Sequence, residues 1–560
     1  MTVRLLQHYV TRQAERGPDE CALVLGDRRV TYGELETRAN RLARLLQAVG
    51  CQPGDRVGLI LPKSPTAVVG MLATLKAGCI YVPVDPDSPA ARIGRILRAA
   101  DCRCLLVSAP GLALLDDLIT ELGIGTRLEV VWMDSERPPA EARFTPRFAE
   151  SDAAHLPDES LPRGGGLDHA PAHILFTSGS TGVPKGVMVT HANVVAFVTW
   201  ANRYFGLGPA DRVSCHSPLH FDLSTYDLYG GFAAGAEVHL VPSELNLFPN
   251  RLVDFIRRQR LTQWFSVPSV LTYLARFDAV TPGDFADLRR ILWCGEVFPT
   301  PPLKYWMERL PHVRFTNLYG PTETTIASSY YTVPAPPADA NANVPIGEAC
   351  GGEEMLVLDP GLAPQPPGTI GDIYVRGAGV TLGYWRDPET TRRVFLPAAG
   401  EGGRLYRTGD LGYRDAGGLI HFLGRADSQI KSRGHRIELG EIEAALHAVA
   451  AVGQGAVVAI DAPDFGGHVI CCAYVPRPGA EGSPGAVKRS LATLVPRYML
   501  PARWRRMDAL PANANGKVDR VALADSFRAE AASQAGGAGQ APPVVGDGRA
   551  PRAPLRTSAR

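Results

Sequence analysis

The first hundred residues alternate between two hydrophobic periods. Residues 31–34 have the T-x-x-E spacing of a helix capping box, and apolar residues then recur at helical intervals up to Gly50, a typical helix C-terminal cap. Short apolar runs at 56–61 and 80–84 predict buried strands, with a helix over 68–77 between them. Strands that alternate with helices in this way predict an α/β fold of layered sheets.

Composition changes along the later chain predict its division into domains. Residues 138–171 are rich in Pro, Ala, Asp and Gly and predict a long surface loop. An amphipathic helix over 438–449 and strands over 457–460 and 469–475 predict a small α+β unit. We therefore expect a large multi-lobed N-terminal domain (1–426), a small mobile α+β C-terminal domain (427–525) and a disordered Ala/Gly/Pro-rich tail (526–560).

Composition and charge narrow the functional classes. Of the 560 residues, 45% are hydrophobic and 21% are charged, which excludes a chain that is disordered throughout. The 58 Lys and Arg residues almost balance the 57 Asp and Glu residues, leaving a net charge of +1. This balance argues against a broad nucleic-acid-binding face and gives no support to a polybasic membrane patch. The ten cysteines form no C-x2-C pair and are expected to be buried thiols in a reducing cytosol.

The sequence predicts neither a signal peptide nor a membrane span. Its N-terminus lacks an apolar core of sufficient length, and the longest apolar stretch, residues 67–85, is interrupted by Lys76, Gly78 and Pro83. We therefore expect a cytoplasmic protein with no membrane partner and no nucleic-acid partner.

A loop rich in glycine and hydroxyl side chains follows a predicted strand at residues 174–176. It reads Thr177-Ser178-Gly179-Ser180-Thr181-Gly182-Val183-Pro184-Lys185-Gly186. Glycine lets backbone N–H groups approach a ligand closely and Lys185 adds a positive charge, so the loop suits a chain of phosphates. The spacing differs from the G-x-x-x-x-G-K-[ST] loop of other nucleotide-binding proteins.

Six further stretches accompany this loop. In chain order they are 75–85 (LKAGCIYVPVD), 317–323 (NLYGPTE), 406–411 (YRTGDL), 424–427 (GRAD), 433–443 (RGHRIELGEIE) and 515–520 (NGKVDR). With the loop, they resemble the motifs of the adenylate-forming superfamily of acyl-CoA synthetases and luciferases. Within it, the chain looks like an amino-acid-activating adenylation domain of nonribosomal peptide synthesis, here a freestanding one.

The resemblance implies a reaction in two halves. A carboxylate attacks the α-phosphorus of ATP to give an aminoacyl adenylate, and a phosphopantetheine thiol then displaces AMP. The implied cofactors are ATP and Mg²⁺, with Glu323 as the metal-associated carboxylate. The implied nucleotide-binding residues are Thr177, Ser178, Gly179, Ser180, Thr181, Gly182, Lys185, Gly295, Glu296, Asn317, Tyr319, Gly320, Thr322, Asp410 and Arg425.

The implied catalytic residues are Lys517, Lys185 and Glu323. Lys517 follows Asn-Gly, a turn signal that places it at a loop tip, and the resemblance implies that its ammonium bridges the substrate carboxylate and the α-phosphate. Asp427 is the implied hinge. Rotation about it would remove Lys517 from the site and bring in the loop around Gly434.

Asp222, within Phe-Asp-Leu-Ser, matches the residue that pairs with the substrate α-ammonium. The implied substrate pocket consists of Asp222, Leu223, Tyr226, Ser266, Leu292, Cys294, Leu318, Ile326 and Ala327, closed by Lys517. This mostly apolar set is similar to cysteine-activating pockets except at Ser266, Cys294 and Ala327. We expect a small to medium amino acid, cysteine first, with serine, alanine-like or proline-like substrates behind it.

Two alternatives stay open at this point. The first is an acyl- or aryl-CoA ligase, which would share the loop, Asp410 and Lys517 but whose substrate has no ammonium for Asp222 to pair with. The second is a non-catalytic partner that binds ATP or an amino acid, which degraded motifs would support. After Arg520 no carrier-attachment motif appears, which predicts loading of a separate carrier protein in secondary-metabolite or antibiotic biosynthesis. The sequence leaves open whether an MbtH-like helper is needed.

Overall fold

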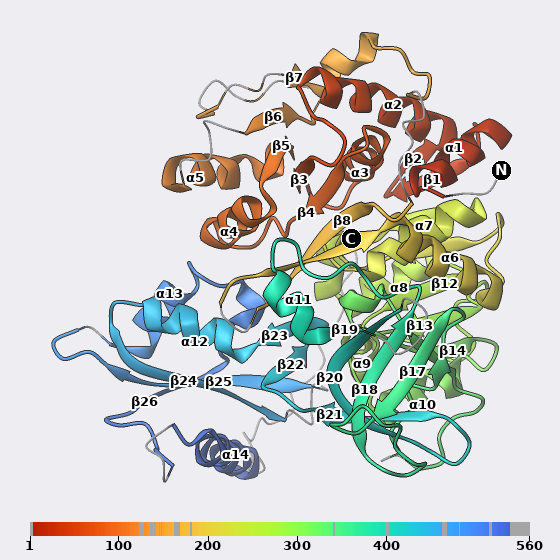
Figure 1. Cartoon of the computed structure of the whole chain (residues 1–560). Helices are drawn as coiled ribbons and strands as arrows, with labels where there is room; N and C mark the ends of the chain where they lie inside the picture. The colour runs from red at the N-terminus through yellow and green to blue at the C-terminus, as the bar shows by residue number, and fades with distance from the viewer. Residues whose placement is uncertain are drawn as a thin grey trace, which may run out of the picture.

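The protein folds as an α/β molecule with a large N-terminal part and a small C-terminal domain, which confirms the predicted fold class (Figure 1). The computed structural model describes residues 4–122, 128–134, 138, 142–144, 146, 148–161, 168–179, 182–339, 342–397, 403–461, 467–480, 482–513 and 518–537. Within these ranges no helix combines the length and the apolarity needed to cross a membrane.

A seven-stranded sheet forms the first layer. In spatial order its strands are β7 (Phe148–Ala149), β6 (Glu129–Trp132), β5 (Cys102–Val107), β3 (Arg56–Ile60), β4 (Ile80–Pro83), β8 (Pro171–Thr177) and β9 (Lys185–Thr190). All neighbouring strands are parallel except β8 and β9, which form an antiparallel hairpin. Parallel strands need crossover connections, which here include the helices α3 (Pro65–Lys76), α4 (Ala90–Ala100) and α5 (Leu112–Leu122).

A nine-stranded sheet forms the second layer. Its order is β16 (Glu348–Ala349), β15 (Ser329–Thr332), β14 (Arg314–Tyr319), β13 (Arg290–Trp293), β12 (Gln263–Ser266), β10 (Arg212–Cys215), β11 (Glu237–Leu240), β1 (Cys21–Leu25) and β2 (Arg28–Thr31). The helices that accompany it are α1 (Gln7–Arg16), α2 (Tyr32–Ala48), α6 (His191–Phe205), α7 (Leu223–Ala234), α8 (Pro249–Arg258), α9 (Pro268–Arg276) and α10 (Thr300–Arg309).

A third sheet leads into the C-terminal domain. It contains β17 (Glu353–Leu358), β18 (Gly371–Gly377), β19 (Phe395–Pro397), β20 (Arg404–Arg414) and β21 (Ile420–Arg425), and α11 (Pro388–Val394) precedes β19. The C-terminal domain has a hairpin of β22 (Gln429–Ser432) and β23 (His435–Glu438) and a sheet of β24 (Val452–Asp461), β25 (His468–Pro476) and β26 (Arg503–Arg506). The helices α12 (Leu439–Ala448) and α13 (Pro484–Leu491) lie on one side of this sheet and α14 (Arg520–Gly537) lies on the other (Figure 1).

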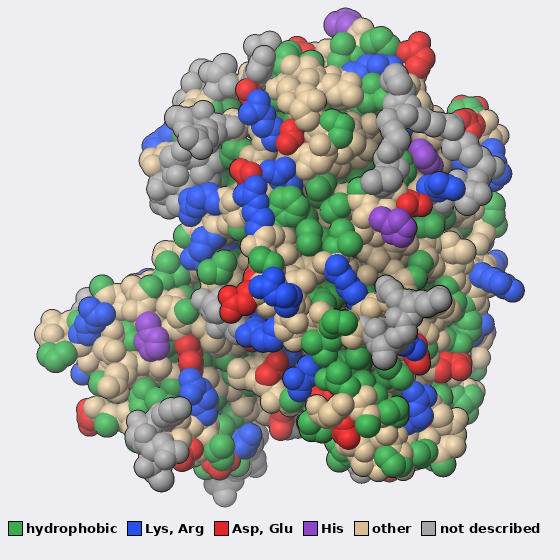
Figure 2. Space-filling view, in the orientation of Figure 1, with side chains coloured by type: hydrophobic (Ala, Val, Ile, Leu, Met, Phe, Trp, Pro, Cys, Tyr) green, Lys and Arg blue, Asp and Glu red, His purple; other side chains and the backbone are tan. Residues whose placement is uncertain are grey.

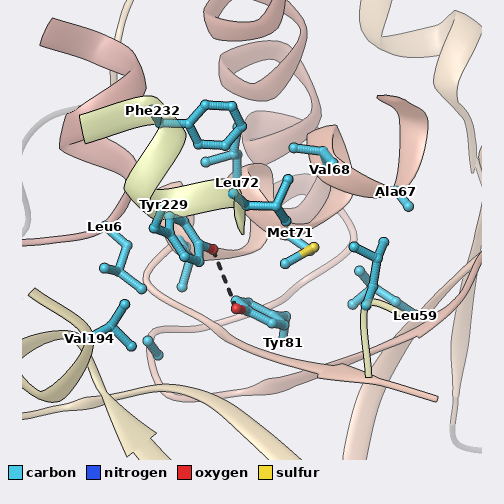
Figure 3. Close-up of a cluster of buried hydrophobic side chains, with 14 of the residues drawn as sticks. Leu6, Leu59, Ala67, Val68, Met71, Leu72, Tyr81, Val194, Tyr229 and Phe232 are labelled. Atoms are coloured by element: carbon cyan, nitrogen blue, oxygen red, sulfur yellow. Dashed lines mark hydrogen bonds between the residues drawn. The ribbon is translucent and has the colours of Figure 1, made fainter. Parts of the chain in front are cut away.

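One hydrophobic cluster joins the first two sheets (Figure 3). Met71 and Leu72 of α3 meet Tyr229 and Phe232 of α7, and the Tyr229 hydroxyl donates a hydrogen bond to the Tyr81 hydroxyl at 3.4 Å. These five side chains are at most 2% exposed. Burial of this size fixes α7 firmly, and with it the residues at the N-terminal end of that helix, where the candidate site lies.

The surface carries both signs of charge. On the face shown in Figure 2, basic and acidic side chains are interspersed, in keeping with the net charge of +1. This face therefore shows no large area of one sign.

The structure bears out the predicted capping box but differs from the predicted surface loop. The capping box is present, because Thr31 Oγ1 accepts a hydrogen bond from the Glu34 backbone N–H at 3.1 Å and Glu34 Oε2 accepts one from the Thr31 N–H at 2.9 Å. The predicted loop over 138–171 holds more structure than expected, namely β7 and a 3-10 helix, Glu150–His155. Val131 and Trp132 provide a parallel partner edge for β7, which composition could not reveal.

Helix α14 extends into the predicted tail. It covers residues 526–537, for which the expectation of disorder is therefore wrong, whereas residues 538–560 lie outside the described residues. Leu523 and Phe527 are at most 1% exposed and pack on β24 and β25, so their burial stabilises a helix that the Ala-rich composition already favours. Before the helix, Val518 forms a β-bridge with Ala512, and the Asp519 N–H donates to the Pro511 carbonyl at 2.7 Å.

Phe527 provides a test of this docked helix. We expect Phe527→Ala to lower the free energy of unfolding of the C-terminal domain by about 3–5 kcal/mol, because the substitution opens a cavity between α14 and its sheet. Urea denaturation of the intact protein measures the change. The matched control is Val521→Ala on the same helix, where the side chain is 71% exposed and the expected change stays within about 0.5 kcal/mol. Equal effects of the two substitutions would contradict the docking.

Candidate functional site

The glycine-rich loop joins β8 to β9. Thr177 and Lys185 are register partners at its base, so the two strands fix both ends of the loop. A Cβ atom on Gly179 would lie 2.0 Å from the carbonyl oxygen of Val183, and Gly182 has a φ of +80°. Both positions therefore require glycine, and the backbone of the loop folds more tightly than side chains would allow.

Side chains at the two ends of the loop already have partners. The Ser178 hydroxyl donates to the backbone carbonyl of Arg436 at 2.6 Å, and Lys185 Nζ lies 5.7 Å from the centre of the Tyr384 ring. The predicted loop residues Ser180 and Thr181 lie outside the described residues.

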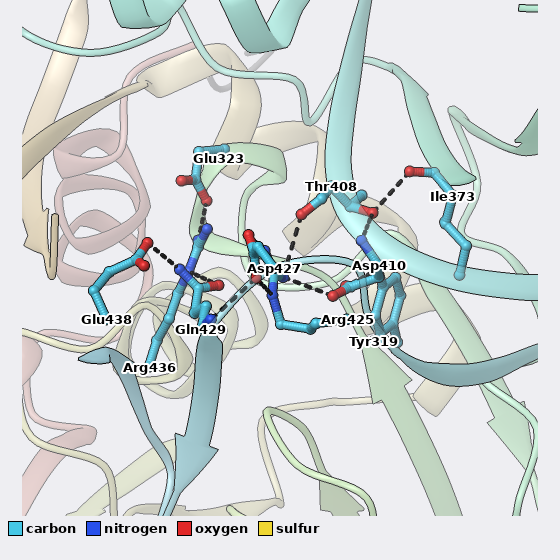
Figure 4. Close-up of polar contacts among 10 residues, drawn as sticks. All are labelled: Tyr319, Glu323, Ile373, Thr408, Asp410, Arg425, Asp427, Gln429, Arg436 and Glu438. Carbon is cyan, nitrogen blue, oxygen red and sulfur yellow. Dashed lines mark hydrogen bonds and ion pairs between the residues drawn. The ribbon is translucent and has the colours of Figure 1, made fainter. Parts of the chain in front are cut away.

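Asp410 is bound by two other residues of the predicted nucleotide site (Figure 4). Its Oδ1 accepts from Arg425 Nη1 at 2.6 Å, and its Oδ2 accepts from the Tyr319 hydroxyl. Arg425 also donates to both carboxylate oxygens of Asp427, at 2.7 and 2.8 Å. A continuous polar chain therefore runs from β14 to the residue predicted as the hinge.

Two cavities adjoin these residues. The larger, of about 820 Å³, lies between the N-terminal part and the C-terminal domain, within the size range of small-molecule sites. From the N-terminal part it is lined by the predicted residues Gly295, Glu296, Asn317, Tyr319 and Arg425. The smaller, of about 120 Å³, is lined by the predicted residues Thr177, Ser178, Gly320, Thr322, Asp410 and Arg425. Since Gly295 and Arg425 line both, the cavities are neighbours.

Asp222 faces the smaller cavity, directly before α7. The Thr322 hydroxyl donates to Asp222 Oδ2 at 2.8 Å. Poor hydration raises the pKa of Asp222 to about 6, an effect that the Thr322 hydrogen bond reduces and the nearby Glu323 increases. The Asp222 carboxylate is poorly hydrated, and the side chain that donates a hydrogen bond to it is a neutral hydroxyl. Such a carboxylate favours a ligand that carries a positive charge.

Only part of the predicted substrate pocket borders this cavity. Asp222, Leu223 and Cys294 line it, and Leu318 lines the larger cavity. The remaining described positions are at most 1% exposed and line neither cavity; they form what we call the wall, namely Tyr226, Ser266, Leu292, Ile326 and Ala327. Lys517, predicted to close the pocket, lies outside the described residues.

The hydroxyl of Ser266 in this wall and the thiol of Cys294 beside it already form hydrogen bonds with other protein atoms. The Ser266 hydroxyl accepts from Trp264 Nε1 at 2.9 Å and donates to the Val267 carbonyl at 3.2 Å. The Cys294 thiol donates to the Ile326 carbonyl at 3.7 Å. Neither group needs a polar substrate atom to satisfy its hydrogen bonding.

Glu323, the predicted metal-associated carboxylate, is 1% exposed. Its Oε1 accepts from the Tyr384 hydroxyl at 2.7 Å, and its Oε2 pairs with Arg436 Nη1 at 2.7 Å. Burial alone would raise the pKa of Glu323, but Arg436 and Tyr384 together hold it below its ordinary value. Because both oxygens have protein partners, the carboxylate does not fit a metal ion in this domain arrangement. Across the described ranges, no group of three or more His, Cys, Asp and Glu residues is arranged to hold one.

The β22–β23 hairpin of the C-terminal domain reaches into the site. The Gly434 N–H donates to Glu296 Oε1 at 2.6 Å, and a Cβ atom on Gly434 would lie 2.7 Å from Val267 Cγ1. Lys431 Nζ lies 5.7 Å from the centre of the Tyr319 ring. The loop around Gly434 therefore lies against Glu296 and Val267 of the N-terminal part.

A second ion pair joins the two domains beside the hairpin. Arg92 of α4 pairs with Glu441 of α12, and the two side chains are 5% and 1% exposed. His435 stacks on Tyr498 and contacts the edge of Phe221. In this pair and the Glu323–Arg436 pair together, each domain contributes one buried glutamate and one arginine to the interface.

Sequence reasoning missed Arg92, Lys431 and Arg436 as residues of the site. Arg436 belongs to the motif stretch 433–443, in which the resemblance assigns it no separate role. Lys431 lies in the polar, basic segment after Gly424, where it reads as one of several solvated charges. Arg92 gave no signal, because its partner Glu441 is 349 positions away along the chain.

Comparisons with known proteins cover most of the chain. Residues 10–385 match the AMP-binding enzyme family, and residues 441–517 match the AMP-binding enzyme C-terminal domain. The chain is 36% identical to L-proline--[L-prolyl-carrier protein] ligase of Pseudomonas fluorescens over 93% of its own length and 99% of the ligase. It is 33% identical to tyrocidine synthase 3 of Brevibacillus parabrevis over 95% of its own length, but it spans only 8% of that protein.

A solved structure shares the architecture. The Vibrio cholerae adenylation domain AlmE, in complex with glycyl-adenosine-5'-phosphate, superposes with a TM-score of 0.81 at 25% identity, covering 94% of this chain and 98% of AlmE. Together with the family match over residues 10–385 and the Asp410 and Arg425 site, this shows that the chain belongs to the AMP-binding enzyme family.

Proposed function

We propose that the protein activates an amino acid with ATP as an aminoacyl adenylate and transfers it to the phosphopantetheine thiol of a separate carrier protein. The observation that supports this most strongly is the Asp222 carboxylate, which faces the same small cavity as Ser178 and Asp410. A group suited to an ammonium thus lies beside groups suited to a nucleotide. The relative from Pseudomonas fluorescens, named as a carrier protein ligase, supports the second half of the proposal.

The first half-reaction brings two anions together. An oxygen of the substrate carboxylate attacks the α-phosphorus of ATP, the bond to the β-phosphate oxygen breaks, and pyrophosphate leaves. Backbone N–H groups of the glycine-rich loop and the ammonium of Lys185 would bind the phosphates and reduce their repulsion of the carboxylate. Asp410 would accept hydrogen bonds from the ribose hydroxyls.

In the second half-reaction the thiol sulfur attacks the acyl carbon and loses its proton to the solvent, the bond from the acyl carbon to the anhydride oxygen breaks, and AMP leaves with that oxygen. The larger cavity borders the C-terminal domain and shares Gly295 and Arg425 with the smaller one, so a flexible pantetheine arm entering between the domains would approach the acyl group beside Asp222. The docked β22–β23 hairpin supports this assignment, because it is the arrangement expected for thiol transfer.

In the rival acyl- or aryl-CoA ligase, the substrate would bring no positive charge to Asp222. An acid without an α-ammonium would leave this poorly hydrated carboxylate without a charged partner, which costs binding energy. A non-catalytic binding protein, the second rival, has no need for the separate phosphate loop, ribose carboxylate and ammonium site that this chain combines.

The proposed substrate is a small to medium, largely apolar amino acid. The cavity beside Asp222 measures about 120 Å³, and Leu223 and Cys294 contribute its apolar lining. The committed hydroxyl of Ser266 argues against a strongly polar side chain. Cysteine, from the similarity of the pocket, and proline, from the named relative, are the first candidates to test.

Amino-acid-dependent exchange of pyrophosphate into ATP tests the function. We expect exchange with one or a few small amino acids, and transfer of that amino acid to a phosphopantetheinylated carrier protein followed by intact-protein mass spectrometry. Fatty and aryl acids serve as controls. Exchange driven by these acids and by no amino acid would favour the ligase alternative, and ATP binding without any exchange would favour the non-catalytic one.

Lys517→Ala should abolish adenylate formation without unfolding the protein. An ammonium about 4 Å from the reacting anions contributes about 4 kcal/mol at an effective dielectric near 20, or roughly a thousandfold in rate. Pyrophosphate exchange measures the loss, and thermal unfolding should be unchanged. Lys304→Ala on α10, where the side chain is 42% exposed, is the matched control and should keep full exchange. A Lys517→Ala protein as fast as the parent would contradict the mechanism.

The pKa of Asp222 predicts a pH dependence. Its value of about 6 lies above the ordinary value, so the fold favours the neutral carboxyl, and below pH 6 the group no longer attracts the substrate ammonium. We expect the KM for the amino acid to rise by roughly tenfold per pH unit below that pH, while the KM for ATP changes little. Because the unfolded chain ionises Asp222 near pH 3.8, the substrate-free protein loses stability as the pH rises from about 3.8 to about 6, and the bound ammonium offsets this loss.

Thr322→Val provides the control for this assignment. Losing the hydroxyl removes a hydrogen bond that favours the ionised form, so the acid limb of the amino-acid KM should move to higher pH. A KM that stays constant between pH 5 and 8 would show that Asp222 does not bind the ammonium.

A further inference from the structure

Three cysteine thiols meet at the edge of the first sheet where the strands β3, β4 and β5 begin. Cys51 lies in the connection between α2 and β3, Cys79 lies directly before β4, and Cys104 lies within β5. All three side chains are at most 2% exposed and belong to one hydrophobic cluster. The thiols of Cys79 and Cys104 both form a hydrogen bond with the sulfur of Cys51.

The backbone holds the first two thiols side by side. Two backbone hydrogen bonds of 2.8 Å join residues 54–55 to residues 78–80. The Cys79 thiol also donates to the Gln52 carbonyl at 3.3 Å, one residue after Cys51. The two connections that bear Cys51 and Cys79 are therefore fixed directly against each other.

Cys51 and Cys79 also have more freedom to adjust than Cys104. Neither of them lies in a helix or a strand, so a small shift of either sulfur breaks no ladder of backbone hydrogen bonds. Cys104, in contrast, is held in a strand that is paired on both sides, by β3 and by β6. A disulfide needs specific placement of both sulfurs, which favours the pair Cys51 and Cys79.

The neighbouring groups make Cys51 the nucleophile of the three. Hydrogen bonds from Cys104 and from Cys79 stabilise the thiolate of Cys51 and lower its pKa, against the effect of burial. The same contact raises the pKa of Cys79, which keeps its proton. The Arg103 guanidinium lies nearby, since a Cβ atom on Gly50 would be 3.5 Å from Arg103 Nη2. A thiolate is the reactive form of cysteine.

Only a thin cover separates this pair from the solvent. Residues 52–54 and Gly78, which lie next to the two cysteines in the chain, are exposed. Two of these four residues are glycines, which have no side chain to shield the sulfurs. A small uncharged oxidant can therefore reach Cys51 after a slight opening of the loop.

We propose that Cys51 and Cys79 form a redox-sensitive pair, which hydrogen peroxide converts into a disulfide. The Cys51 thiolate attacks one peroxide oxygen, the O–O bond breaks, and the departing hydroxide takes up the proton that Cys51 had released. The Cys79 sulfur then attacks the resulting sulfenic acid, the S–O bond breaks, and the Cys79 proton leaves with the hydroxide as water. Two thiols are oxidised to one disulfide, and one peroxide is reduced to two waters.

The pair lies away from the site described above. β4 and β8 are parallel, so the glycine-rich loop that follows β8 lies at the opposite edge of the sheet from Cys79, which precedes β4. The proposal therefore stands apart from the proposed function and does not depend on it.

Peroxide oxidation of the full chain tests the pair. The reduced protein is treated with hydrogen peroxide, the remaining thiols are blocked with N-ethylmaleimide, and the peptides are analysed by mass spectrometry. We expect the Cys51–Cys79 disulfide to form on the order of tenfold faster than oxidation of Cys215, a fully buried thiol on β10 of the second sheet. Dithiothreitol should reverse the bond, and urea, which unfolds the chain, should remove the preference.

Substitutions separate the roles of the three thiols. Cys79→Ser should stop at the sulfenic acid, which dimedone labels at residue 51, and Cys51→Ser should give neither the label nor the disulfide. Cys104→Ala should still form the disulfide, but more slowly, because the Cys51 thiolate loses one hydrogen-bond donor. Cys215→Ser is the matched control and should behave as the parent.

The unsubstituted protein alone can refute the proposal, so the test survives a variant that does not fold. No disulfide in the folded parent, or a Cys51–Cys104 disulfide in its place, would overturn it. Oxidation of Cys79 at the parent rate in folded Cys51→Ser would overturn the assignment of Cys51 as the nucleophile.

Discussion

The need to pair poorly hydrated carboxylates between the two domains is the constraint on which the rest of the structure depends. Glu296, Glu323, Asp410 and Glu441 lie in or beside the interface, and acids with little access to water need positive or hydrogen-bonding partners. Three of the four find those partners in the opposite domain, and only Asp410 is neutralised from its own side, by Arg425. Domain docking is therefore an electrostatic arrangement as much as a packing one.

The sequence was most informative where chemistry and local backbone coincide. The loop at 177–186 needs glycine for steric reasons that the structure confirms at Gly179 and Gly182, and the alternation of strands and helices predicted the layered sheets. Asp222, Asp410 and Arg425 were named from motifs, and the structure brings all three to one cavity.

Long-range pairing and burial were beyond the reach of the sequence. The partner of Arg92 is far away in the chain, and nothing in the residues around either member marks the pair. The wall positions Tyr226 and Leu292 were predicted to touch substrate, but which side chains border a cavity depends on how whole helices pack. The sequence did not predict the helical part of the tail, because its Ala-rich composition is compatible with both a disordered chain and a docked helix. Docking depends on the packing of Leu523 and Phe527 against a sheet, which composition does not reveal.

The β-bridge between Ala512 and Val518 has a mechanical consequence. Together with the Asp519–Pro511 hydrogen bond it joins residues 511–512 to residues 518–519, and Leu510 and Val518 pack against the cluster formed by β24, β25 and α14. The described residues on either side of the proposed catalytic Lys517 therefore belong to the same packed unit as β24 and β25. A movement of the C-terminal domain as one unit would carry these flanking residues with it.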